Sequence, residues 1–182
     1  MKKLGNSRKR TRQLAPLVRG PLKTKEKGEL AELAFLHKAA SLGFGVARPH
    51  GDSERYDFIL DSGERFWRVQ VKSTSYNEPD RSAYVVNACH NDKGGKVKAY
   101  QAAEVDFIAV YIVPLGIWYI VPVNQLGALR ALRLYPFGCQ GADRFEQFRE
   151  AWHLMAPGAD LPPPRTSRHA RSSNLHCKRF VK

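Results

Sequence analysis

Residues 55–74, RYDFILDSGERFWRVQVKST, contain two apolar runs separated by Asp61, Ser62 and Gly63. A short polar, glycine-containing segment between two apolar runs is typical of a β-hairpin, so strands are predicted over 56–60 and 65–74. A hairpin needs only apolar residues on its buried face, yet Asp57 interrupts the first run and further polar residues interrupt the second. These interruptions are the first candidates for a functional role.

Alternation along the second strand sorts its side chains between the two faces of the sheet. The odd-numbered positions form the predicted core face and carry Trp67, Val69, Val71 and Ser73. The even-numbered positions carry a polar set, Arg68, Gln70, Lys72 and Thr74. Gln70 and Lys72 therefore share a face two residues apart, and pairing of the hairpin strands can bring Asp57 beside Gln70.

Asp57 in an apolar strand must meet a metal, a cation or water, because burying an unpaired carboxylate is costly. Oxygen ligands from aspartate, glutamine and main chain, completed by water, suit Mg²⁺ rather than zinc. A lysine such as Lys72 can orient an attacking water or stabilise charge that develops on a phosphoryl group. Spacing alone also fits a solvent-facing strand with an Asp–Lys pair, so both interpretations stay open on this evidence.

The preceding segment, KEKGELAELAFLHKAASLGFG at residues 25–45, predicts an amphipathic helix with Gly43 as its C-cap. Its apolar residues recur at helical spacing, at Leu30, Leu33, Ala34 and Leu36. Glu29 and Glu32 are three residues apart and so share a helix face near the N-terminus. The helix macrodipole favours acids there, which is a structural reason for both residues without any site.

The rest of the chain predicts a mixed α/β (α+β) fold. Short strands are expected over 44–48 and 82–88, and a second, almost wholly apolar hairpin over 106–114 and 117–123 is expected at the centre of the sheet. Residues 89–104 contain two glycines and three lysines and predict an exposed loop. Beyond residue 124 the pattern turns helical, with Phe145, Phe148 and Trp152 at spacings of three and four. This order of elements predicts a mixed sheet flanked by helices.

The net charge of +13 is concentrated at the two ends of the chain. Residues 1–27 carry a net charge of +9 and residues 160–182 one of +5, so the segment between them is nearly neutral. We therefore expect a basic flexible arm over 1–24, one domain over 25–156 and a basic, proline-rich tail over 157–182. Cationic arms suit a polyanion such as nucleic acid, because neutralising phosphates releases counterions; solubilising tails are the alternative.

Cysteine usage and hydropathy indicate the cellular location to expect for this chain. Three widely spaced cysteines without a CxxC pair, Cys89, Cys139 and Cys177, argue against a disulfide framework and a zinc site. No apolar run approaches the roughly 20 residues that span a bilayer, and no signal-peptide stretch follows the basic N-terminus. A reduced, cytoplasmic location without membrane contact is expected.

Four short pieces in a fixed order carry a resemblance to a known family. KGELAEL, RYDFIL, WRVQVKST and EVDFIAVYIVPLGIWYIVPV are similar to the PD-(D/E)XK nuclease superfamily, specifically to the branch of group I intron-associated homing endonucleases with a Q-x-K motif. The similarity extends from Lys27 to Val123 and implies a restriction-endonuclease-like core. One departure is Tyr56, which stands where the family motif has proline.

The resemblance implies a role for each matched position. The implied catalytic set is Glu29, Asp57, Gln70 and Lys72, and the implied metal ligands are Asp57, Gln70, Glu29 and the main-chain carbonyl of Val71. Glu32 is the competing choice for the helical acid, because it shares a face with Glu29. Gln70 replaces an acid of the wider superfamily, so we expect one well-bound Mg²⁺ per site, for which Mn²⁺ can substitute.

The substrate implied by the resemblance is double-stranded DNA. Basic residues interleaved with an aromatic one follow the motif strand and suit phosphate contacts; they are Arg81, Lys96, Lys98 and Tyr100. Ordinary solvated loop residues are the alternative for this group. Cleaving both strands requires two active sites, so a homo-oligomer, a dimer or a tetramer, is the simplest arrangement.

The leading hypothesis is a Mg²⁺-dependent DNA endonuclease of the homing type. A repair or junction-resolving nuclease would use the same site on branched DNA. A catalytically silent nucleic-acid-binding protein is the alternative from another class, and it predicts salt-sensitive binding without metal-dependent cleavage.

Overall fold

The main sheet of the protein has five strands among the described residues. The structure is a computed structural model that describes residues 22–51, 53–78, 82–92, 94–138 and 144–164. In sheet order the strands are β1 (Gly45–Ala47), β2 (Phe58–Asp61), β3 (Phe66–Thr74), β8 (Phe107–Ile112) and β9 (Ile117–Pro122). β3 and β8 pair in parallel and the other neighbours are antiparallel, which confirms the mixed sheet.

Both predicted hairpins are present in this sheet. β2 pairs with β3 around a turn in which the Asp61 Oδ1 accepts a hydrogen bond of 2.8 Å from the Gly63 N–H, and Gly63 has φ +87°. β8 pairs with β9 around Gly116, whose φ is +67°. The second hairpin differs from expectation in one respect, because β9 lies at the end of the five-stranded order rather than at its centre.

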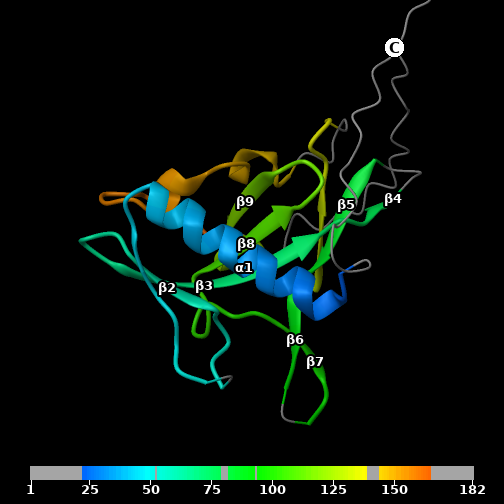
Figure 1. The fold of residues 1–182 in the computed structure, drawn as a ribbon, viewed down its shortest axis with the longest axis horizontal. Coiled ribbons are helices and arrows are strands. Elements are labelled where there is room, and N and C mark those ends of the chain that lie inside the picture. The colour runs from blue at the N-terminus through cyan, green and yellow to red at the C-terminus, as the bar shows by residue number, and fades with distance from the viewer. Residues whose placement is uncertain (1–21, 52, 79–81, 93, 139–143, 165–182) are drawn as a thin grey trace, which may run out of the picture.

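The helix predicted from residues 25–45 is present as α1 (Thr24–Ser41), which crosses one face of the main sheet (Figure 1). It begins where the Lys23 N–H donates to the Glu26 carboxylate at 2.8 Å, and the backbone turns away at Gly43, with φ +91°. Towards the sheet the helix buries Ala31, Phe35 and Ala39. The two alanines let the helix approach the sheet closely, and the ring of Phe35 packs against aromatic rings of Phe58, Trp118 and Trp152.

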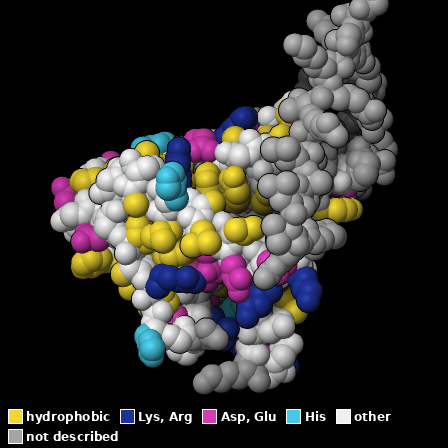
Figure 2. Space-filling view, in the orientation of Figure 1, with side chains coloured by type: hydrophobic (Ala, Val, Ile, Leu, Met, Phe, Trp, Pro, Cys, Tyr) yellow, Lys and Arg dark blue, Asp and Glu magenta, His cyan; other side chains and the backbone are white. Residues whose placement is uncertain are grey.

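The leucines whose spacing indicates an amphipathic helix do not form the buried face of α1. Leu30 and Leu33 are 50% and 56% exposed, and Leu36 is at the border of exposure. Figure 2 shows hydrophobic side chains gathered along the surface over α1. The leucine spacing is helical, but it marks a face that points away from the sheet, because the buried positions are occupied by smaller residues and one phenylalanine.

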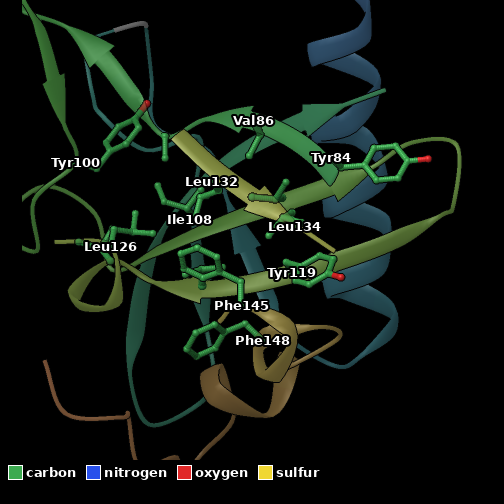
Figure 3. Packing of buried hydrophobic residues seen from close by; sticks show 14 of the residues in the cluster. Tyr84, Val86, Tyr100, Ile108, Tyr119, Leu126, Leu132, Leu134, Phe145 and Phe148 are labelled. Atoms are coloured by element: carbon green, nitrogen blue, oxygen red, sulfur yellow. The ribbon is translucent and has the colours of Figure 1, made fainter. Parts of the chain in front are cut away.

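The opposite face of the main sheet is covered by a second sheet of β10 (Ala131–Leu134), β5 (Ala83–Asn87) and β4 (Asn77–Glu78). Between the two sheets, side chains from β8 and β9 pack against β5 and β10 in a cluster that Figure 3 shows from close by. Members of this cluster include Val86, Ile108, Tyr119, Leu132 and Leu134. Apolar residues therefore cover both faces of the hairpin 107–122, which explains its nearly continuous apolar sequence.

Residues 89–104 are not the exposed loop that their composition predicts. They form a two-stranded hairpin of β6 (Cys89–Asn91) and β7 (Val97–Ala99), followed by a buried Tyr100. The turn is stabilised by Asp92, whose Oδ1 accepts hydrogen bonds of 2.9 Å from the N–H groups of Gly94 and Lys96. Glycine and lysine mark the exposed tip of this hairpin, and composition alone does not distinguish such a tip from a loop.

The helix expected after residue 124 is also absent from the described part of that segment. In its place lie three short 3-10 helices, at Val123–Gln125, Glu146–Phe148 and Trp152–Met155. Glu150, which lies between the second and third of these helices, has φ +47°, and this left-handed conformation keeps the two from joining into one helix. The aromatic spacing is therefore satisfied by two separate turns, one of which places Phe148 between the sheets and the other of which places Trp152 beside α1.

The predicted basic arms lie mostly outside the described residues, so their organisation stays a prediction. Within the described part of the chain, no helix has the length and hydropathy needed to cross a bilayer.

Candidate active site

Asp57 immediately precedes β2 and is fixed by the hairpin. Its N–H donates to the Val69 carbonyl at 2.9 Å, one step before the Phe58–Val69 pair of the strand register. Its Oδ2 accepts a hydrogen bond of 2.8 Å from the Val71 N–H and another from the Gln70 amide. The proximity of Asp57 to Gln70 that hairpin pairing suggested is therefore present in the structure.

The Asp57 carboxylate is partly buried, and its hydrogen-bond donors are neutral groups. Burial raises the pKa of Asp57 above its ordinary value, the Val71 N–H opposes that effect, and the negative charge of Glu32 adds to it. Lys72 and Arg48 lower the pKa by smaller amounts. The site therefore gathers negative charge that a bound cation would stabilise.

Gln70 lies between the two oxygens of the predicted metal site. Its side chain is only 8% exposed, and its Nε2 donates to the Asp57 Oδ2 and, at 3.2 Å, to the Val71 carbonyl. The partly positive NH₂ group thus lies where the oxygens of Asp57 and Val71 converge. For the Gln70 side-chain oxygen to bind a cation here, the amide has to flip by about 180°, so that its oxygen takes the place of its NH₂ group.

Glu32, rather than Glu29, extends from α1 into the site. Glu32 lines a pocket of about 650 Å³ together with Asp57, Gln70 and Lys72. Glu29 is 58% exposed and its carboxylate lies 3.9 Å from the Lys25 ammonium. The two acids share a helical face, but the rotation of α1 on the sheet brings only Glu32 to the pocket, so the structure favours the competing choice.

Lys72 reaches the same pocket from β3. Burial lowers the pKa of Lys72, and the charges of Asp57, Cys89 and Glu32 partly oppose this effect. The Lys72 Nζ lies 5.6 Å from the centroid of the Tyr100 ring, within the range of a cation–π contact. Among the described residues no ion pair includes Lys72, which leaves its ammonium free to act on a bound anion.

The residues predicted to contact DNA differ in how far they are exposed and in what they contact. Tyr100 is only 4% exposed, so it is not a surface loop residue. Its ring lies near Lys72 and contacts the His90 ring at 5.0 Å between centroids. Lys98 is on β7 and pairs with Asp92 at 3.0 Å, whereas Lys96 is exposed beside the hairpin turn. Arg81 lies outside the described residues. DNA contacts by Lys96 and Lys98 stay a prediction.

The donor set fits an oxygen-preferring divalent cation. Within the described part of the chain, no group of three or more His, Cys, Asp and Glu side chains is arranged to hold a metal ion. The pocket instead combines two carboxylates, Glu32 and Asp57, with the Gln70 amide and the Val71 carbonyl. These are hard oxygen donors of the kind that Mg²⁺ and Ca²⁺ use, with remaining positions filled by water or substrate.

One residue of this site was missed by the sequence analysis. Arg48, just after β1, forms an ion pair with Glu32, and its guanidinium lies 5.2 Å from the centroid of the Phe58 ring. The only sequence signal for it is an arginine directly before Pro49 at the end of a predicted strand, which carries no information about a partner on α1.

The fold and this pocket define a nuclease of the PD-(D/E)XK class, and comparison with known families agrees. The model of the PD-(D/E)XK endonuclease family matches residues 22–155, so the chain belongs to that family. Its structure is similar to that of a bacterial homing endonuclease, I-Ssp6803I, with 31% sequence identity and a TM-score of 0.64. The match covers 72% of this chain and 92% of that one, which supports the homing-endonuclease-like branch.

Two other solved structures resemble the chain more distantly. Hjc, a Holliday junction resolvase from Archaeoglobus fulgidus, is 16% identical with a TM-score of 0.44, over 75% of this chain and 99% of that one. MepB is 13% identical with a TM-score of 0.38, over 66% and 91%. No curated protein sequence gives a significant match.

Proposed function

We propose that the protein is a Mg²⁺-dependent DNA endonuclease of the homing type. The observation that carries the proposal is the convergence of Glu32, Asp57, Gln70 and Lys72 on one pocket, in a chain that belongs to the PD-(D/E)XK endonuclease family. The similarity to a bacterial homing endonuclease supports the finer assignment. The basic ends of the chain supply positive charge suited to a DNA backbone.

Glu32, Asp57, the Gln70 side-chain oxygen and the Val71 carbonyl would hold the cation. When bound, a divalent cation neutralises charge on a phosphoryl group and lowers the pKa of a coordinated water. Lys72 supplies a positive charge on the same side of the pocket, where it orients the attacking water and stabilises charge that develops on the phosphate oxygens. The buried Tyr100 ring lies 5.6 Å from the Lys72 Nζ, where its face stabilises the ammonium by a cation–π contact.

Cleavage of a random-sequence duplex library, followed by sequencing of the ends, tests this function. Sites cut in the presence of Mg²⁺ and not in its absence are the expected result, with recurrent flanking sequences if cleavage is site-specific. A parallel reaction on four-way junctions separates homing-type cleavage from junction resolution. Salt-sensitive DNA binding without any metal-dependent cut would contradict the enzyme assignment.

A homo-oligomer, a dimer or a tetramer, follows from the need to cut two strands. Leu33 and Leu36 of α1 are exposed and lie outside the pocket, an apolar surface of the kind that marks protein interfaces, and we assign a second copy of the chain to it. Sedimentation equilibrium is expected to give a mass above that of one chain, and Leu33→Gln is expected to shift it towards the monomer. A wild-type protein that sediments as a monomer would contradict this assembly.

The variant Gln70→Glu is expected to be less stable than the wild type in the absence of metal and to bind a divalent cation more tightly. It replaces the amide donor between Asp57 and Val71 by a third carboxylate, so three negative groups meet in the metal-free pocket. We expect a lower melting temperature in a chelator and a larger rise on adding Mg²⁺ than in the wild type. Differential scanning calorimetry with and without cation measures both. An unchanged melting temperature in the chelator would show that Gln70 does not bridge these oxygens.

A further inference from the structure

Arg48 occupies the position of an internal counter-ion in the candidate active site. We propose that Arg48 neutralises Glu32 in the metal-free protein, is displaced when a divalent cation binds, and then contacts a DNA backbone phosphate at the mouth of the pocket. This inference rests on the proposed nuclease function, because it concerns the same pocket and the same substrate class. It adds a residue that acts through Glu32 before DNA binds and on the substrate afterwards.

The fold places Arg48 where it bridges the sheet and the helix. β1 pairs antiparallel with β2, with Val46 opposite Leu60 and Ala47 opposite Ile59. Continuing this register brings position 48 beside Phe58, and the guanidinium lies 5.2 Å from the centroid of that ring. From there the Nη2 reaches the Glu32 Oε2 on α1.

Exposure and charge indicate which partner of this ion pair can leave. The Arg48 side chain is 59% exposed, whereas that of Glu32 is 24% exposed and lines the pocket. A divalent cation held by Glu32 and Asp57 would lie close to a guanidinium of like charge, which weakens cation binding. Arg48 therefore competes with the cation, and its release costs little because much of the side chain is already in water.

The released guanidinium suits a phosphate. Its planar fork donates two parallel hydrogen bonds to phosphate oxygens, and arginine is favoured wherever such bidentate contacts are made. Moving to a phosphate requires the guanidinium to give up its contact with the Phe58 ring. A cation–π contact at an exposed site is weak, so a bidentate phosphate contact can replace it. In the absence of cation, the same guanidinium is engaged by Glu32.

Calorimetric titration with Ca²⁺ measures the competition directly. Arg48→Gln is expected to bind Ca²⁺ about fivefold more tightly than the wild type, because it removes the competing charge. Arg65→Gln is the matched control, since the Arg65 guanidinium also stacks on an aromatic ring, Trp67, at 3.9 Å, and Arg65 lies just before β3, at the opposite end of that strand from Lys72. The control is expected to leave the affinity unchanged. Unchanged or weaker Ca²⁺ binding by Arg48→Gln would overturn the competition.

The salt dependence of binding to duplex DNA tests the second half of the proposal. With Ca²⁺ present, the slope of log affinity against log salt is expected to be smaller in Arg48→Gln by about 0.9, the value for one phosphate contact. In a chelator, the slopes of variant and wild type should agree. A slope difference of the same size with Ca²⁺ and in the chelator would show that Arg48 contacts DNA whether or not the cation is bound. No slope difference in either condition would show that Arg48 makes no phosphate contact.

These outcomes are distinct from failure of the proposed function. If Asp57→Asn leaves the heat of Ca²⁺ binding unchanged, the pocket is not the metal site and the nuclease assignment of these residues fails first. If Asp57→Asn abolishes that heat and Arg48→Gln does not strengthen it, the metal site stands and only the role of Arg48 is wrong.

Discussion

Asp57→Asn is expected to abolish metal-dependent cleavage and, at the same time, to stabilise the metal-free protein. The carboxylate is partly buried, receives hydrogen bonds from neutral donors and faces Glu32 across the pocket, so its charge is costly until a cation arrives. Asparagine keeps the shape and an oxygen that can accept the Val71 N–H. We expect cleavage to fall by at least about 1,000-fold and unfolding in a chelator to require about 1 kcal/mol more free energy.

The pH dependence of this stability difference has a definite sign. Because the folded-state pKa of Asp57 is raised, the folded wild type holds its proton more tightly than the unfolded chain. Its stability therefore falls as pH rises from the ordinary aspartate pKa through the raised one. The asparagine of the variant does not titrate, so the advantage of the variant is expected to be small at acidic pH and to grow towards neutrality. Thermal unfolding in a chelator across this range measures it.

Glu29→Gln and Glu32→Gln provide matched controls on one helix. Each removes a single carboxylate from α1, but only Glu32 lines the pocket. We expect Glu32→Gln to weaken Ca²⁺ binding and cleavage, and Glu29→Gln to leave both near wild-type values. If Glu29→Gln weakens both and Glu32→Gln does not, Glu29 is the helical acid.

An Asp57→Asn protein that still cleaves DNA would show that this pocket is not the active site.

The part of the site that lies on one hairpin could be predicted from sequence. Alternation along residues 65–74 places Gln70 and Lys72 on one face, and a short turn at Gly63 sets the register that brings Asp57 to Gln70. These are local consequences of strand geometry, with few residues between the partners. The family resemblance then supplied the chemistry, which spacing alone did not distinguish from an exposed Asp–Lys pair.

The contributions of α1 and β1 depended on contacts that no local pattern encodes. The choice between Glu29 and Glu32 depends on how α1 is rotated on the sheet, and the leucine spacing does not reveal that rotation because Ala31 and Phe35 pack on the sheet while the leucines do not. The pair between Glu32 and Arg48 joins two elements through tertiary packing. Burial of Tyr100 likewise depends on tertiary packing, because Tyr100 belongs to the core cluster between the two sheets, and the polar composition of residues 89–104 gives no sign of this.

Lys72→Met is expected to separate cation binding from catalysis. Methionine keeps an unbranched side chain of similar length and removes the ammonium, whose pKa is already lowered by burial. The cation ligands are untouched, so Ca²⁺ affinity should be retained or increased, since a neighbouring positive charge is lost. Cleavage should fall by about 100-fold to 1,000-fold, the size typical of losing one group that stabilises developing charge. Single-turnover cleavage beside calorimetric titration measures the two effects separately.

Lys98→Met is the matched control for this variant. Lys98 is on the neighbouring hairpin, is more exposed and pairs with Asp92 rather than facing Asp57. Its loss should weaken DNA binding modestly and leave the single-turnover rate at saturating DNA unchanged. Lys72→Arg should not restore the rate, because a larger, planar guanidinium does not place a compact point charge at the same position in a partly buried pocket. A Lys72→Met enzyme with more than about a tenth of wild-type activity would mean that the cation ligands alone support the reaction and that Lys72 only fills the pocket wall.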